Sequence, residues 1–262
     1  MGEPLIYPVP TNEARLEMRV EPQSEPVMHQ TWSRLLFLHW EWDPREIQEK
    51  LPPGLFVDTH NGRAYVGIIP FFVSDTKPFV PFIPAPGDFL EVNVRTYVYD
   101  ELGRPGVWFF SLDCTSAFAA NAAKFFYSLP YHTAAIEAEI NGDFVEYRAR
   151  RNADAQNRLS EFHYKPEPEQ IATPPGSLSF FLIERYLLFA WSEKSQSLTS
   201  ARVYHQPYQA QKVLVGKWGS HFLDLNGFKP SLKDPVHTAF AQPVRVKIYG
   251  PEPVPQRPVR GS

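Results

Sequence analysis

The sequence predicts a mainly β protein of the α+β class, with one antiparallel sheet curled into a barrel and a few helices flanking it. Many short apolar or alternating stretches follow one another along the chain, separated by turn residues. Asn61-Gly62 and Asn141-Gly142 are dipeptides typical of tight β-hairpin turns. The 27 prolines are spread along the chain, which disfavours long helices.

The expected strands are rich in β-branched and aromatic residues, which fit a pleated and half-buried surface. Residues 56–73 form two of them, joined by the Asn61-Gly62 turn. The other expected strands lie at residues 31–42, 89–100, 106–115, 133–140, 144–151, 201–215 and 242–250.

Three helices are expected between these strands. The first begins at Asp43, an N-cap residue, with Pro44 at the first helical position. The others span residues 116–128 and 177–186, and Asp113 is a candidate cap for the former. The proline-rich stretch at residues 76–88 is a loop long enough to cover part of the body.

The length of 262 residues fits one large β-rich domain. We expect residues 29–250 to form this domain. Residues 1–28 are polar and dotted with proline, so they form an arm that either packs on the body or stays loose. Residues 251–262 are of low complexity and are expected to be a flexible tail.

Composition excludes several classes of protein. The net charge is −3 with no basic block, which argues against nucleic acid as a partner. No apolar run approaches the roughly 18 residues that span a bilayer, so no membrane partner is expected. A single cysteine, Cys114, allows no internal disulfide, and no signal peptide is evident; both suit a cytoplasmic location.

Recognised cofactor and metal motifs are missing from the sequence. There is no glycine-rich dinucleotide or phosphate loop and no nucleophile elbow. The eight histidines show no spacing typical of a metal site. We therefore expect no metal and no cofactor, and we expect Cys114 to be a packing residue.

The stretch "LEVNVRTYV" has a polar face if it is a strand, because side chains alternate between faces. Glu91, Asn93, Arg95 and Tyr97 share that face, and valines and Thr96 share the other. In one interpretation the polar face is solvated and the valines are buried. In the other, the polar face lines the barrel interior, where Arg95 would bind a carboxylate and Glu91 would act as an acid or base.

The same region resembles a known family. The stretch "PGDFLEVNVRTYVYDELGRPGVWFFSLDCTSAFAANAAKFFYSLPYHTA", followed by "FLIERYLLFAW" and "HQPYQAQ", resembles the YqjF-like family, also called domain of unknown function 2071. The resemblance covers roughly residues 30–250. The family is similar to acetoacetate decarboxylase, so the resemblance implies a β-barrel with a closed interior.

In that enzyme a lysine after a Gly-Phe-Pro segment forms a Schiff base with a keto acid. Here Glu91 matches the enzyme's glutamate and Pro130 is retained, but Tyr131 and His132 replace the two lysines. Neither residue can form an imine, so the decarboxylase mechanism is not carried over. His132 is then a candidate general acid or base and Tyr131 a candidate donor to a carbonyl oxygen. The alternative is that both start a strand and bond only to the backbone.

Further polar residues occur within apolar stretches. Glu184 and Arg185 need partners if they are buried. Either Tyr186 and Arg185 reach the pocket, or they form a structural cluster that fixes a helix to the barrel. His205 either reaches the same cavity or bonds to a loop carbonyl.

The sequence thus favours an enzyme acting on a small organic acid or carbonyl compound without a Schiff base. Glu91 and His132 would transfer protons. The substrate-binding residues would be Arg95, Asn93, Tyr131, His205 and Tyr186. Two alternatives stay open: a non-catalytic binding protein, and a structural or interaction protein with a filled barrel. Association of several copies is a further open expectation.

Overall fold

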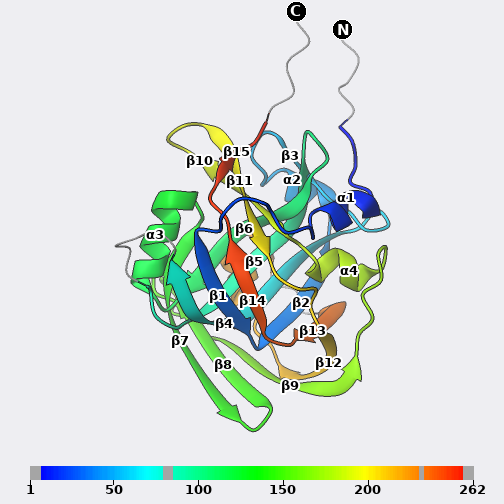
Figure 1. Ribbon diagram of the computed structural model, residues 1–262. Helices are drawn as coiled ribbons and strands as arrows, with labels where there is room; N and C mark the ends of the chain where they lie inside the picture. The colour runs from blue at the N-terminus through cyan, green and yellow to red at the C-terminus, as the bar shows by residue number, and fades with distance from the viewer. Residues whose placement is uncertain (1–6, 79–84, 230–232, 256–262) are drawn as a thin grey trace, which may run out of the picture.

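The computed structural model describes residues 7–78, 85–229 and 233–255. Strands dominate it and the helices are few and short, so the prediction of a mainly β protein is confirmed (Figure 1). The helices are α1 (Asn12–Glu17), α2 (Pro44–Gln48), α3 (Ala117–Tyr127), α4 (Leu178–Ile183) and α5 (His221–Leu225). The strands are β1 (Met28–Ser33), β2 (Leu35–Trp42), β3 (Leu55–Val57), β4 (Ala64–Pro78), β5 (Phe89–Asp100), β6 (Pro105–Cys114), β7 (Tyr131–Asn141), β8 (Phe144–Arg151), β9 (Ser160–Gln170), β10 (Leu187–Ser192), β11 (Ser197–Tyr204), β12 (Ala210–Lys217), β13 (His237–Ala241), β14 (Val244–Ile248) and β15 (Glu252–Pro253).

Strand pairing makes one sheet that closes on itself twice. The first ring runs through β1, β14, β11, β10, β6, β5 and β4 and returns to β1. The second ring runs through β2, β4, β5, β6, β7, β8, β9, β12 and β13 and returns to β2. Strands β4, β5 and β6 therefore form a wall that both rings share.

The expectation of a purely antiparallel sheet needs one correction. Strand β6 runs parallel to β10 and to β7, whereas the other pairings are antiparallel among the described residues. The pairing of β6 with β7 follows from α3, because a parallel neighbour requires a crossover connection that a helix can supply. Figure 1 shows α3 at one side of the molecule and α4 at the other.

Two hydrophobic cores lie on opposite faces of the shared wall. The first core takes Ile69 and Phe71 from β4 and packs against β11, β14, α3 and α4. The second core takes Val92 and Val94 from β5 and packs against β7, β8, β9 and α5. Alternation of side chains along β4 and β5 divides their residues between the two cores.

The three expected helices exist, with corrected ends. Asp43 caps α2 and accepts from the backbone of Arg45 at 2.8 Å. Ser116, and not Asp113, caps α3, since its hydroxyl accepts from the Ala119 amide at 3.2 Å. The expected helix at residues 177–186 ends at Ile183 because the chain turns into β10 there.

Several expected strands are divided or differently paired. Residues 31–42 are split at Arg34, whose positive φ of 53° breaks the extended chain. The Asn61-Gly62 turn forms, but β3 pairs with β5 and does not continue as a hairpin partner of β4. Residues 201–215 form two strands, β11 and β12, and the sequence patterns did not predict β9, β10, β13, β15, α1 or α5.

The N-terminal segment packs on the body where it is described. Arg15 of α1 binds both carboxylate oxygens of buried Asp58, at 2.7 and 2.6 Å. Arg19 donates to Glu184 at 3.3 Å. At the other end β15 pairs with β11, while residues 256–262 of the expected tail and residues 79–84 of the expected loop lie outside the described residues.

None of the described helices is both long and apolar enough to cross a lipid bilayer.

Candidate functional site

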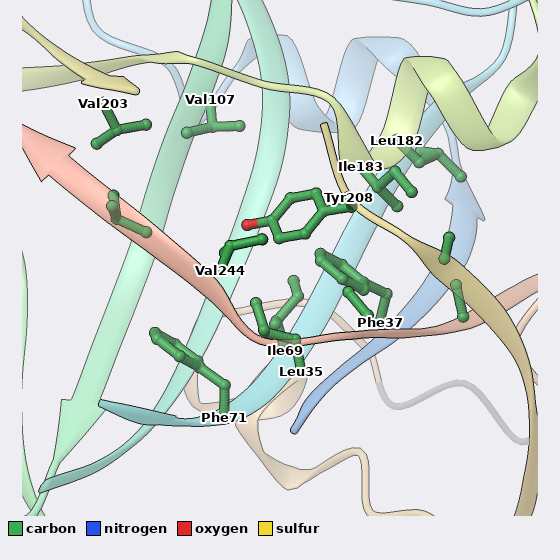
Figure 2. Close-up of a cluster of buried hydrophobic side chains, with 14 of the residues drawn as sticks. Leu35, Phe37, Ile69, Phe71, Val107, Leu182, Ile183, Val203, Tyr208 and Val244 are labelled. Atoms are coloured by element: carbon green, nitrogen blue, oxygen red, sulfur yellow. The ribbon is translucent and has the colours of Figure 1, made fainter. Parts of the chain in front are cut away.

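The first core contains a cavity of about 400 Å³. Its wall is mostly apolar, and Trp32, Phe71, Phe89, Phe109 and Val203 are among the residues that form it. Figure 2 shows the inner part of this core, where the ring of Tyr208 lies among aliphatic and aromatic side chains from several strands and from α4. A concave, largely apolar site with a few polar groups is typical of small-molecule binding.

Strand β5 supplies the main polar groups of the cavity. Glu91, Asn93 and Arg95 line it, and Val92 and Val94 point into the second core. The alternative that the sequence left open is thereby decided: the polar face of this strand lies inside, and the valines are buried as well. Both faces are enclosed because β5 belongs to the wall between the two rings.

A bulge in β6 decides which of its residues reach the cavity. Arg95 pairs with Phe109 and Val94 with Ser111, so one residue of β6 has no partner on β5. An extra residue in one strand shifts the alternation beyond it. Phe109 and Leu112 therefore both line the cavity, while Ser111 and Asp113 lie on the opposite face.

Asp113 has a structural partner on that opposite face. Arg151 of β8 binds both of its carboxylate oxygens, at 2.6 and 2.8 Å. Both side chains are buried, at 0% and 8% exposed. The pair anchors β8 to β6 and takes no part in the cavity.

Glu91 and Tyr131 form the outer polar pair of the cavity. The Tyr131 hydroxyl donates to Glu91 Oε2 at 2.9 Å, and Glu91 is only 3% exposed. Burial raises the pKa of Glu91 to about 8; the nearby Asp113 charge adds to this rise and the hydrogen bond from Tyr131 opposes it. Glu91 is therefore mostly uncharged at neutral pH and can donate a proton.

Arg95 and Tyr208 both line the cavity, and we call these two residues the inner polar pair. Arg95 Nη2 donates to the Leu182 carbonyl at 3.1 Å, and its guanidinium lies 5.4 Å from the centre of the Phe37 ring. Within the described part of the chain no carboxylate pairs with Arg95. Burial raises the pKa of Tyr208, and the Arg95 charge opposes that rise.

Two polar atoms on β5 lack partners. Asn93 Oδ1 and Arg95 Nε are buried and form no hydrogen bond with the described residues. A buried polar atom without a partner is costly, so a ligand that bonds to these atoms would recover that free energy. A guanidinium that lies in a largely apolar cavity and has no carboxylate partner among the described residues is suited to an anion such as a carboxylate.

His132 does not join this group. Strand β7 begins at Tyr131, so Tyr131 points into the cavity and its neighbour His132 points to the other face. Burial lowers the pKa of His132, and the positive charge of Arg151 lowers it further. The sequence made both Tyr131 and His132 candidate site residues, and the structure places only Tyr131 at the cavity.

Tyr186 and His205 lie behind the cavity wall. The Tyr186 hydroxyl donates to Glu184, whose other oxygen accepts from the Tyr208 amide at 2.9 Å. His205 bonds through Nδ1 to the carbonyl of Gln206 at 2.8 Å and stacks on Tyr186. These residues fix the loop that carries Tyr208. They therefore agree with the alternative in which they have a structural role and do not reach the pocket.

The described residues around the cavity offer few groups for covalent catalysis or for metal binding. Lysine is missing from the described residues that line the cavity, and Lys124 of α3 is exposed. Cys114 is buried beside Glu91, and burial raises the pKa of its thiol to about 12. The described residues contain no cluster of three or more histidine, cysteine, aspartate or glutamate side chains that would hold a metal ion.

Sequence analysis did not place Tyr208 or the aromatic wall in the site. Tyr208 was visible in "HQPY" beside His205, but a loop residue has no periodicity that shows where it points. The apolar lining from α3, including Phe118 and Phe126, was predicted only as part of a helix, with no indication of which face lies on the cavity.

Comparisons with known proteins agree with this fold. The uncharacterized protein YqjF of Bacillus subtilis (strain 168) is 33% identical over 222 residues, which cover 83% of this chain and 89% of that protein. Acetoacetate decarboxylase of Legionella pneumophila superposes with a TM-score of 0.61 at 11% identity, covering 90% of this chain and 92% of the enzyme. The enduracididine biosynthesis enzyme MppR, complexed with pyruvate, gives 0.59 at 14% identity, covering 88% and 91%.

The two structural neighbours show only that the fold is shared, because their sequences differ so much from that of this chain. The family is established by sequence. The model of domain of unknown function 2071, described as an uncharacterized conserved protein, matches residues 29–245. The resemblance expected from the sequence motifs is confirmed, and the chain belongs to the family of domain of unknown function 2071.

Proposed function

We propose that the protein binds an organic acid or carbonyl compound in the first-core cavity and transfers a proton on it without forming an imine. The observation that carries the proposal is the outer polar pair, a buried and largely uncharged Glu91 bonded to Tyr131. Arg95 anchors an anionic group of the ligand, and Asn93 offers a further hydrogen-bond acceptor. His132, Tyr186 and His205 are left out, because they do not line the cavity.

The proposed step is keto–enol interconversion. Glu91 gives its proton to the carbonyl oxygen of the ligand, and the carboxylate that remains takes a proton from the adjacent carbon. The ligand becomes an enol and Glu91 regains its proton, so atoms and charge balance. Tyr131 holds the carboxyl group in place through its hydrogen bond.

The similarity of this fold to the two structural neighbours supports the choice of ligand, by analogy only. One neighbour is described as complexed with pyruvate, which is both an acid and a carbonyl compound. Another is an acetoacetate decarboxylase. A shared fold does not carry a reaction with it, so the residues of this cavity must support the proposal themselves.

The test is exchange of ligand α-hydrogens for deuterium, followed by proton NMR with a panel of oxo acids. We expect the wild-type protein to speed exchange and Glu91→Gln to lose at least ~100-fold of this rate. Glutamine keeps the shape and still accepts from Tyr131. Glu137→Gln is the matched control, because Glu137 is exposed on β7. An unchanged rate in Glu91→Gln would contradict the proposal.

A second candidate is a non-catalytic binding protein, favoured by the mostly apolar cavity wall. It predicts Arg95-dependent binding without any hydrogen exchange. A cytoplasmic location and an assembly of several copies remain predictions from the sequence.

A further inference from the structure

The two polar pairs lie apart along β5. Glu91 and Arg95 are four residues apart, which places their Cα atoms roughly 13 Å from each other in a strand. The Arg95 guanidinium leans away from Glu91, since it lies 5.7 Å from the ring of Tyr97 and bonds to the Leu182 carbonyl of α4. The two pairs are therefore separate polar sites within one cavity.

The outer pair lies nearer to the opening of the cavity. Glu91 pairs with Cys114, at the end of β6 that leads into α3. Phe118 and Phe126 of α3 line the cavity and are also 45% and 55% exposed, so the cavity reaches the surface at this helix. Arg95 lies farther from α3 along β5, so the inner pair is the deeper one.

Asn93 lies between the two pairs on β5, and apart from it the wall that joins the pairs to each other and to α3 is mostly apolar. Leu112, Ile69 and Phe71 belong to it, together with Ala122 and Ala123 of α3. In a short oxo acid only one or two bonds separate the carboxylate from the carbonyl group. Such a molecule can contact one polar pair but cannot reach both.

We infer that the ligand is an elongated, largely apolar monocarboxylic acid with a carbonyl group several carbons from its carboxylate. This inference rests on the proposed function and names its substrate class. The carboxylate binds Arg95 and Tyr208 at the inner end. The carbonyl group lies at Glu91 and Tyr131, and the remaining apolar part extends toward α3.

The first experiment measures binding of unbranched monocarboxylic acids of increasing length by calorimetry. Each added methylene should tighten binding about threefold to fourfold until the cavity is filled. Arg95→Met should weaken binding of the long acids by ~30-fold or more. The matching methyl esters should bind weakly and equally to both proteins. Arg245→Met is the control, since Arg245 is exposed on β14.

The second experiment moves the carbonyl group along an acid of fixed length. A carbonyl distant from the carboxylate should improve affinity over the unsubstituted acid, and a carbonyl next to the carboxylate should not. The gain should disappear in Tyr131→Phe, which keeps the ring and removes the hydroxyl. Tyr204→Phe is the control, because Tyr204 does not line the cavity.

The outcomes separate this inference from the proposed function. Affinity that is independent of chain length, with short oxo acids bound through Arg95 and exchanging hydrogen, overturns the inference and leaves the function standing. Long acids that bind through Arg95 but exchange no hydrogen support the ligand class and overturn the catalytic step. If no acid binds in an Arg95-dependent way, both are wrong.

Discussion

The two cores share a wall and differ in what they enclose. In the second core, Val92 and Val94 pack among apolar side chains, and buried tyrosines there direct their hydroxyls to backbone carbonyls, as Tyr147 does to Glu91 at 2.9 Å. In the first core, Glu91 and Arg95 from the same strand border a cavity of about 400 Å³. One face of β5 thus stabilises the fold, while the other face supplies polar side chains to the cavity.

The largest expected difference between the cores concerns packing. Phe162→Ala removes a fully buried ring from the second core and should lower the free energy of unfolding by about 3–5 kcal/mol. Phe89→Ala enlarges a cavity that already exists, so we expect a smaller loss, about 1–2 kcal/mol. Urea denaturation of both variants checks this. Equal losses would mean that the first core is as tightly packed as the second.

Asp113 and Glu91 are carboxyl groups on opposite faces of the shared wall, and we expect their replacement to affect stability differently. Asp113→Asn leaves Arg151 buried without its charge partner, so we expect a loss of about 3–5 kcal/mol. Glu91→Gln replaces an uncharged acid with an uncharged amide of similar shape, so stability at neutral pH should change little. Chemical denaturation at pH 7 measures both. A Glu91→Gln protein as unstable as Asp113→Asn would show that Glu91 is ionised.

The pH dependence of stability tests Glu91 directly. The folded protein keeps the Glu91 proton until about pH 8, whereas the unfolded chain releases it near the ordinary pKa of 4.5. The folded state binds more protons between these values, so this contribution is complete below pH 4.5 and declines as pH rises toward 8, by roughly a few kcal/mol.

The measurement is the difference in unfolding free energy between wild type and Glu91→Gln at successive pH values. Subtraction removes the buried histidines, whose lowered pKa values give the opposite slope at acidic pH. A flat difference between pH 4.5 and 8 would contradict the uncharged state. Hydrogen exchange catalysed by the wild type should also decline above about pH 8, as Glu91 loses its proton.

The smallest expected effect concerns Lys124. This residue is exposed on α3 and does not line the cavity, so Lys124→Ala should change neither the denaturation midpoint nor ligand hydrogen exchange. Borohydride reduction in the presence of an oxo acid should trap no adduct that mass spectrometry detects. An adduct on Lys124 would contradict the proposal that the reaction proceeds without an imine.

The sequence revealed the alternation of β5 but could not decide which face lies inside, because a period of two is the same for a solvated strand and an enclosed one. Both faces are enclosed here, and that depends on pairings between β4, β5 and β6 that are distant in sequence. The hairpin at Asn141-Gly142 and the capped helices were easier to predict, because their signals are local.

Other features of the site depend on shifts of one residue. The bulge beside Phe109 turns Asp113 away from the cavity, and nothing in "VWFFSLD" marks it. The start of β7 at Tyr131 decides that the tyrosine, and not His132, faces inward. Such shifts reverse the faces of a strand, so sequence analysis could name the segment and could not choose between the two neighbours.

The shared wall also has a consequence for protein engineering. Positions 91, 93 and 95 face the cavity, while positions 92 and 94 fill the second core. A library randomised only at the three odd positions should keep the fold and sample new ligand preferences. The same diversity at the even positions should yield mostly insoluble protein. The alternation of a single strand thus separates the part of the chain that can be redesigned from the part that must be kept.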